Sequence, residues 1–304
     1  MDKVYVVIPM YNSIGFIDNA LNSVLLQKNV NVKAIVVDHG SADQSYQYVK
    51  NKYENENRVV VIGLKRIPGE IRSASRPLNV GMRYVEKHSN NGDWVMRLDA
   101  DDVLVDNTTI YDTLQKARKN ACLVAGSMYF INTDRKEAQE YCQASRYDSV
   151  KCLRKNAAYA YPHHSTLISI NLLKKIIRDD GFCYFEKIGY GEDLDYTLRL
   201  LAYCDDNTVS FTRVPMIIKE LSGDTISNSV NLRTLLNDHF CIFKRNTCLS
   251  KVFFMRIVLW YLFENAGIAG RKINSLMKPP ALKFSASQKL DYNEIYHMKA
   301  KWKH

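Results

Sequence analysis

The 304-residue sequence is poor in the residues that mark fibrous, low-complexity or disulfide-rich chains. It has only 13 glycines and 7 prolines, so collagen-like and linker-rich states are excluded and most of the chain should form regular elements. Its 7 cysteines are an odd set without a Cys-x-x-Cys pair. This argues against a disulfide framework and a structural zinc site, and it favours a reducing compartment. A Gly-x-Gly-x-x-Gly motif is also missing, which excludes an NAD-linked Rossmann enzyme.

Long apolar runs are missing as well. The longest candidate, residues 252–263, is shorter than the ~20 residues needed to span a bilayer and is interrupted by Arg256. With Trp260 and Tyr261 inside it, this segment is expected either to lie in a membrane interface or to form a core helix of a small C-terminal subdomain. The N-terminal segment has a short apolar run and an early Asp2, so it is not expected to be a signal peptide.

Positive charge is concentrated near the end of the chain. The formal net charge is +10, yet residues 1–239 contain 30 basic and 29 acidic side chains, whereas residues 240–304 contain 12 and 3. Such a block is typical of contact with a polyanion. Because the aromatic residues of this region lie within an apolar run, we expect residues 240–304 to contact an anionic membrane surface and not nucleic acid. A nucleic-acid-binding protein remains the alternative.

Strand and helix patterns alternate through the first half of the sequence. Apolar β-branched runs predict strands at residues 4–8, 33–37, 58–62, 94–98 and 122–130, and helical spacing predicts helices at 16–25, 73–87, 108–119 and 193–203. This alternation is typical of an α/β fold with a mostly parallel central sheet flanked by helices.

An acidic cluster ends one of these strands. Asp99, Asp101 and Asp102 lie within four residues, and their mutual repulsion is best relieved where a cation or a ligand lies between them. Oxygen-rich sites of this kind suit Mg²⁺ or Mn²⁺. The alternative is a solvated turn that caps the next helix, a role that Asp106 or Asn107 can also fill.

Two further acidic positions follow predicted elements. Asp38 ends a neighbouring strand, where a carboxylate can accept a hydrogen bond from an imide or a ribose. Glu192 and Asp193 begin a helix and can be simple partners of the helix dipole. The flanking glycines, Gly189 and Gly191, favour instead a loop that approaches a ligand closely.

In order and spacing, the motifs resemble family 2 glycosyltransferases with the GT-A fold. The segments are VVIPMYN at 6–12, VVDHGSAD at 36–43, LNVG at 78–81, MRLDADD at 96–102 and GED at 191–193. The resemblance covers roughly residues 3–230 and is strongest to bacterial enzymes of O-antigen or capsule synthesis. It implies a GT-A domain at 1–230, with a nucleotide-sugar half at 1–105 and an acceptor half at 106–230. A helical basic region follows at 231–304.

The resemblance implies a UDP-linked hexose or N-acetylhexosamine as donor. The residues that would contact the nucleotide are Pro9 and Tyr11 at the base and ribose, Asp38 at the uracil and Asp99 at the ribose. Arg76 or Arg72 would support the diphosphate. The implied acceptor is a sugar, lipid-diphosphate-linked or part of an oligosaccharide.

The resemblance also implies a metal and a base. Asp101 and Asp102 would bind Mn²⁺ or Mg²⁺, which neutralises the departing UDP. Asp193, next to Glu192 in the family's base motif, would take the proton of the acceptor hydroxyl in a single inverting displacement. The enzyme would work in the cytoplasm, peripherally on the inner face of the membrane.

The sequence departs from the family pattern at several positions. His39 stands where the second motif usually has Asp, and Ser222 stands where many members have a metal-binding His, a role that His239 is a candidate to replace. His163 and His164 fall in an acceptor-side region. A nucleotidyltransferase is the competing enzyme class, but it should carry a Gly- and Lys-rich loop after the first strand, where this chain has none.

Overall fold

The computed structural model describes residues 3–71, 73–142, 163–221, 232–246 and 286–303, with Val150, Arg154 and Met255. The strands are β1 (Lys3–Met10), β2 (Asn31–Asp38), β3 (Val59–Gly63), β4 (Trp94–Arg97), β5 (Val103–Leu104), β6 (Leu123–Asn132), β7 (Glu137–Cys142), β8 (Thr166–Ser169), β9 (Val209–Glu220) and β10 (Ala286–Leu290). The helices are α1 (Ile17–Leu25), α2 (Ser45–Lys52), α3 (Ser75–His88), α4 (Thr109–Gln115), the 3₁₀ turn η3 (His163–Ser165), α6 (Ile170–Asp180), α7 (Glu192–Ala202), α9 (Leu232–Arg245) and α13 (Tyr292–Ala300).

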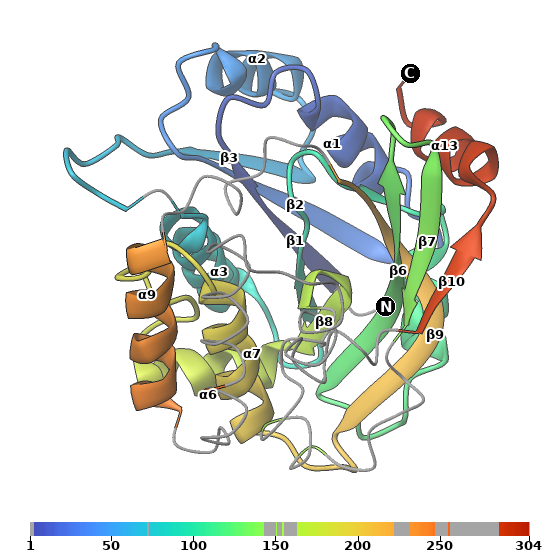
Figure 1. Cartoon of the computed structure of the whole chain (residues 1–304). Coiled ribbons are helices and arrows are strands. Elements are labelled where there is room, and N and C mark those ends of the chain that lie inside the picture. The colour runs from blue at the N-terminus through green and yellow to red at the C-terminus, as the bar shows by residue number, and fades with distance from the viewer. Residues whose placement is uncertain are drawn as a thin grey trace.

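All described strands belong to one sheet. Its order is β10-β7-β6-β8-β4-β1-β2-β3, and β9 pairs with β5 and β6 (Figure 1). The expected parallel arrangement is found for β3, β2, β1 and β4. In the other half, β8, β7 and β10 pair antiparallel with their neighbours, so the sheet is mixed and the prediction of a mostly parallel sheet was wrong there. Helical connections enforce parallel pairing in the first half, whereas the direct β6–β7 hairpin must be antiparallel.

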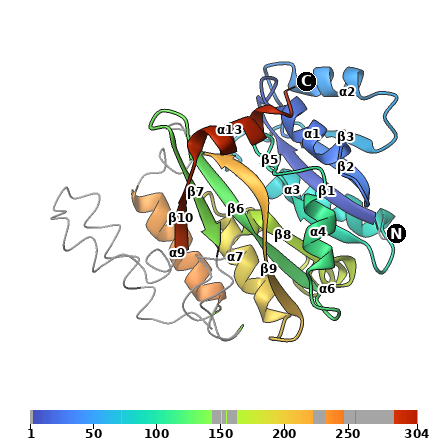
Figure 2. The same ribbon diagram turned by 90° about the vertical axis from the view of Figure 1, so that its right-hand side faces the viewer.

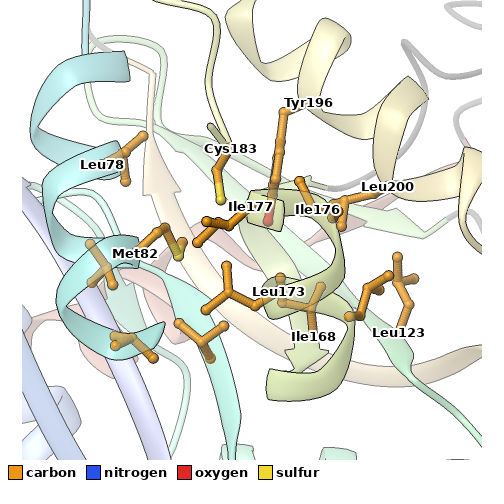
Figure 3. Close-up of a cluster of buried hydrophobic side chains, with 14 of the residues drawn as sticks. Leu78, Met82, Leu123, Ile168, Leu173, Ile176, Ile177, Cys183, Tyr196 and Leu200 are labelled. Carbon is orange, nitrogen blue, oxygen red and sulfur yellow. The ribbon is translucent and has the colours of Figure 1, made fainter. Parts of the chain in front are cut away.

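Helices cover both faces of the sheet. In β1, Tyr5 and Val7 belong to one buried cluster, and Val6 and Ile8 belong to the other, as alternation along a strand requires. The first cluster packs under α3, α6 and α7, and the second under α1, α2 and α4. Figure 3 shows the first cluster, with Leu78 and Met82 on α3, Leu173, Ile176 and Ile177 on α6, and Tyr196 and Leu200 on α7. The site described below lies at one edge of this three-layer core.

A glycine sets the distance between α3 and β1. A Cβ atom at Gly81 would lie 2.3 Å from Cγ1 of Val7, which no side chain can tolerate. The LNVG motif therefore brings a helix directly against the central strand, and Asn79 of the same motif fixes the following loops. Its side chain donates to the Tyr184 carbonyl oxygen (2.8 Å) and accepts from the Cys183 backbone N–H (3.0 Å).

The C-terminal region is not entirely helical, contrary to expectation. β10 pairs antiparallel with β7, and α13 lies over the sheet end formed by β6 and β7 (Figure 2). Trp302 is buried there and donates its indole N–H to the Leu104 carbonyl oxygen (2.9 Å). No helix among the described residues is long and apolar enough to cross a membrane.

Candidate active site

The predicted strand ends meet at one edge of the sheet. β2 and β4 flank β1 in parallel, with Met10 paired to Asp38 and Val7 paired to Arg97. Neighbouring strands are about 4.8 Å apart, so β2 and β4 run about 10 Å apart on either side of β1, and β4 ends three residues earlier along it than β2. The segments that follow these three strands therefore border a common region at the carboxyl edge.

Tyr11 offers a flat surface just beyond β1. Its side chain is exposed, the Arg66 guanidinium lies over its ring at 5.0 Å, and Arg66 Nη1 donates to the tyrosine hydroxyl (3.1 Å). Pro9, two residues earlier, is still inside β1 opposite Val37. An exposed aromatic ring held by a cation is suited to stacking on a planar base.

Asp38 caps the turn that follows β2. Its Oδ2 accepts the backbone N–H groups of Gly40 (3.0 Å) and Ser41 (3.1 Å), and its Oδ1 accepts the Ser41 hydroxyl. The carboxylate is buried, and most of its acceptor capacity is used within the loop. The arrangement accounts for an Asp at this position by local structure, and a contact with uracil stays a prediction.

His39 and Arg76 are both tied to Glu70. The imidazole Nε2 pairs with Glu70 Oε1, and Arg76 Nη1 lies 2.8 Å from Oε2 of the same carboxylate. Arg76 Nη1 also donates to the Lys65 carbonyl oxygen (3.0 Å). These contacts hold the loop after β3 against the turn after β2, so the structural role of Arg76 is clear and its role at the diphosphate remains a prediction. Arg72 lies outside the described residues.

Asp99 is surrounded by cations. It accepts from Arg97 Nη2 (2.9 Å) and from Lys219 Nζ (3.1 Å), and His164 Nδ1 lies 3.4 Å away. Burial works against its ionisation, but Arg97, Lys219 and His164 together hold the pKa of Asp99 well below its usual range. Asp99 is therefore ionised at neutral pH, as a ribose-binding carboxylate would need to be.

Asp102 and Asp101 are in opposite environments. Asp102 is buried and accepts from Lys219 Nζ (3.2 Å), whereas Asp101 is exposed and makes no hydrogen bond or ion pair within the described part of the chain. Burial, with repulsion from Asp99 and Asp101, raises the pKa of Asp102 to about 7, although Lys219 opposes the shift. Of the three carboxylates, Asp101 is the one without an ion pair among the described residues, although the charge of Lys219 acts on it from a distance.

The base motif begins α7. Gly191 has φ of +79°, a conformation that favours glycine, and it directs the chain into the helix so that Glu192 and Asp193 lie in the first turn. Asp193 Oδ1 accepts the Leu194 N–H (2.7 Å). Burial raises the pKa of Glu192 to about 7, the charge of Asp193 adds to the shift, and Arg97 opposes it.

Arg97 connects the β4 end with the α7 start. Its guanidinium is buried, which alone would lower its pKa, but the charges of Asp99, Glu192 and Asp193 raise that pKa instead. Because Coulomb interactions of this size require proximity, one arginine has both the strand-end acid and the base motif around it. Arg97 therefore has Asp99 on one side and the Glu192-Asp193 pair on the other, while a shared site that also includes Asp101 and Asp102 stays a prediction.

Sequence reasoning missed two cations of this site. Arg97 enters the sequence pattern only as part of the MRLDADD motif, and no motif of the sequence includes Lys219. A basic residue directly before an acidic cluster is a usable signal for Arg97. Lys219 is 117 residues from Asp102, and only the pairing of β9 with β5 and β6 brings it there.

Of the other histidines that the sequence singled out, the structure describes the side chains of His164 and His239. His239 is buried on α9 with its ring 5.5 Å from that of Tyr190, in the loop before the base motif. His164 lies in η3 beside Asp99, the residue expected at the ribose, and its assignment to the acceptor side stays a prediction. Ser222 and the side chain of His163 are outside the described residues.

The carboxylate and imidazole groups at the end of β4 could hold a divalent cation. Ligand atoms of Asp99, Asp102 and His164 all lie within 4.8 Å of one another. Lys219 Nζ donates to Oδ2 of Asp99 and to Oδ2 of Asp102. The buried Oδ1 of Asp102 has no hydrogen-bond partner among the described residues. This oxygen and the unpaired carboxylate of Asp101 are hard ligands of the kind that Mn²⁺ and Mg²⁺ prefer.

A mixed central sheet between two layers of helices, with acidic residues at the carboxyl ends of its parallel strands, is a GT-A-like α/β fold. It is similar to the fold of Staphylococcus aureus TarS. A solved structure of TarS residues 1–349 in complex with UDP-GlcNAc gives a TM-score of 0.59 at 18% identity, over 86% of this chain and 73% of that chain. The chain belongs to glycosyl transferase family 2, whose sequence model matches residues 5–177.

Two curated relatives match parts of the chain. Glycosyltransferase GlyG of Streptococcus pneumoniae is 28% identical over 142 residues, which are 46% of this chain and 43% of GlyG. The poly(ribitol-phosphate) beta-N-acetylglucosaminyltransferase TarS of S. aureus is 33% identical over 106 residues, 34% of this chain and 17% of TarS. The matched segments thus span less than half of these relatives.

Proposed function

We propose that this protein is an inverting glycosyltransferase that moves a hexose or N-acetylhexosamine from a UDP-sugar to a sugar acceptor. The observation that carries the proposal is the position of Arg97, which has the strand-end acid Asp99 and the base motif Glu192-Asp193 around it. A donor held at the strand end would place its sugar toward the start of α7. The membership in glycosyl transferase family 2 supports the same activity.

The donor site is proposed at the ends of β1, β2 and β4. Tyr11 with Arg66 would stack on the base, Asp38 would contact it from the neighbouring turn, and the ionised Asp99 would accept from a ribose hydroxyl. The UDP-GlcNAc complex of the structurally similar TarS supports a uridine donor.

A divalent cation would be held by Asp101 and by Oδ1 of Asp102, which has no hydrogen-bond partner in the described part of the chain. When bound, it supplies positive charge to the diphosphate leaving group without proton transfer. Lys219 is proposed to keep Asp99 and Asp102 neutralised and fixed, so that Asp101 faces the diphosphate. Arg76, tied to Glu70, would contribute a further positive charge on that side.

Proton transfer is assigned to the start of α7. The acceptor hydroxyl is a weak acid, so a carboxylate within hydrogen-bond reach must take its proton as the new bond forms. Asp193 is the proposed base. Glu192, with its pKa near 7, sets the local charge beside it. With one base and one displacement, an α-linked donor would leave a β-linkage.

The acceptor is proposed to be lipid-diphosphate-linked or an oligosaccharide, within bacterial surface polysaccharide synthesis such as O-antigen or capsule. The protein would act in the cytoplasm, peripherally on the membrane. The support is the excess of basic residues in 240–304 and the apolar, aromatic segment 252–263, which itself lies almost wholly outside the described residues. If this is correct, removing residues after about 245 releases the protein from anionic liposomes; unchanged pelleting would contradict it.

A thermal-shift screen of nucleotide sugars, with and without Mn²⁺, tests the class directly. We expect stabilisation by one UDP-sugar that increases with Mn²⁺, followed by sugar transfer to an acceptor from that donor. A response to nucleoside triphosphates with release of pyrophosphate would favour the competing nucleotidyltransferase instead. Retention on duplex DNA or RNA at high salt would favour the nucleic-acid-binding alternative.

A further inference from the structure

We propose that α9 holds the base motif in its working position, with Asp238 as the positioning residue. This inference rests on the proposed function, in which Asp193 takes the acceptor proton. The sequence assigned residues 231–304 to a separate basic region, yet α9 lies beside α7 (Figure 1), and their contacts flank the base motif on both sides.

The first contact precedes the base motif. Asp238 is buried, and its Oδ2 accepts the backbone N–H groups of Gly189 (2.9 Å) and Tyr190 (3.0 Å). One side chain therefore fixes two consecutive peptide groups of the loop that leads into α7. Hydrogen bonds from backbone N–H groups to a carboxylate are among the stronger ones in proteins, so this loop is firmly attached to α9.

The second contact is steric. A Cβ atom at Gly191 would lie 2.9 Å from Cδ1 of Ile242, one turn after Asp238 on α9. The aromatic ring of Tyr190 lies beside that of His239, with centroids 5.5 Å apart. The segment Gly189–Gly191 is thus packed against one face of α9, and Gly191 permits the close approach.

The third contact follows the base motif. Asp195, fully buried in the first turn of α7, accepts from Arg245 Nε (3.3 Å) and Asn246 Nδ2 (3.1 Å) at the end of α9. Arg199 Nε donates to the same carboxylate (2.9 Å). The Arg245 guanidinium also stacks on the Phe185 ring at 3.9 Å.

Together these contacts place Glu192 and Asp193 between two anchored points. Gly189 and Tyr190 are fixed by Asp238 before the pair, and Asp195 is fixed after it. A displacement of about 1 Å at a catalytic group can cost about a hundredfold in rate. The geometry therefore predicts that loosening α9 lowers turnover more than it affects donor binding, because the donor residues lie on the strand ends.

The test compares Asp238→Ala with Asp238→Asn and with Asn237→Ala, an exposed neighbour on the same helix as control. Asp238→Ala should lower kcat about ten- to a hundredfold while the affinity and stoichiometry of UDP binding, measured by calorimetry, stay unchanged. Asp238→Asn keeps one oxygen that can accept both N–H groups and should restore most of kcat. The control should match the wild type.

Loss of UDP binding in parallel with kcat in Asp238→Ala, or a failure of Asp238→Asn to restore turnover, would overturn the proposal. Amide hydrogen exchange separates it from the proposed function. Exchange at Gly189 and Tyr190 should accelerate in Asp238→Ala even if the wild type transfers no sugar, in which case only the proposed function fails. Unchanged exchange at these amides would overturn the positioning role itself.

Discussion

Arg97 and Lys219 show how single residues allow an acidic site to exist inside a fold. Three carboxylates within four residues repel one another, and the buried Arg97 and the half-buried Lys219 neutralise Asp99 and Asp102. The carboxylate of Asp101 stays exposed and unpaired within the described residues. The residual negative charge of the cluster is thereby directed outward, where a cation and a diphosphate would bind.

The base assignment predicts a selective loss of turnover. Asp193→Asn removes the carboxylate that would accept the proton, and it should lower kcat by about 10²–10⁴-fold. Because Asp193 is on α7 and the donor residues are on strand ends, the affinity for UDP should not change. Initial rates and calorimetry on the same preparation measure both quantities, and normal turnover would show that another group is the base.

The pKa of Glu192 predicts a pH dependence. Its folded value of about 7 means that the carboxyl is neutral below pH 7 and negative above it. The negative charge that Glu192 gains at higher pH favours removal of the proton from the nearby acceptor hydroxyl, so kcat should rise as pH increases through about 7. In Glu192→Gln this rise should be absent. A flat kcat profile of the wild type between pH 6 and 8 would contradict the prediction.

Lys219 should stabilise the fold through the acids that it pairs. Lys219→Met leaves Asp102 buried without a counter-charge, and this should lower the free energy of unfolding by about 3–5 kcal/mol. Lys301→Met, which breaks only the exposed pair with Asp106, should cost about 0–1 kcal/mol and is the matched control. Urea unfolding measures both, and equal effects would show that the buried pairs contribute little.

At the scale of elements, α13 and the residues after it cover an apolar surface at one end of the sheet. Trp302 is buried among residues of β5, β6, β7 and β9, and Asn22 of α1 donates to its carbonyl oxygen (3.0 Å). Trp302→Ala removes this large side chain and should lower the free energy of unfolding by about 3–5 kcal/mol. Thermal unfolding measures this loss. An unchanged midpoint would mean that the packing of Trp302 does not stabilise the fold.

The sequence predicted the first-half elements well because each has a strong local signal. β1, β2, β3 and β4 were placed within two residues, since continuous β-branched runs and helical spacing depend only on neighbouring residues. Strand direction in the second half and the added strand β10 were not predicted. Both depend on which distant segment completes the pairing, and a local pattern does not encode that.

The candidate site was predictable to the same extent. Acids at strand ends and at a helix start follow from the motifs, and the parallel order of β2, β1 and β4 brings their ends together. Their partners come from remote segments. Lys219 of β9 donates to Asp102, and Asp238 of α9 binds the loop before Glu192. Their contribution depends on tertiary contacts that become visible only in the folded chain.

At the scale of the whole molecule, the C-terminal region is continuous with the domain that carries the site. α9 packs against α7, and β10 extends the sheet at β7 (Figure 2). The proposed membrane contact must therefore be compatible with both attachments. The basic residues of this region that the structure describes lie on or directly after α9, β10 and α13.

Calorimetric titration of UDP into the wild type and Asp101→Asn, each with and without Mn²⁺, tests the central claim most directly. The wild type should bind UDP more tightly with Mn²⁺ than without it, and Asp101→Asn should lose that gain while keeping its metal-free affinity and its folded stability. Equal enhancement by Mn²⁺ in both proteins, or no binding of UDP by the wild type, would contradict the account.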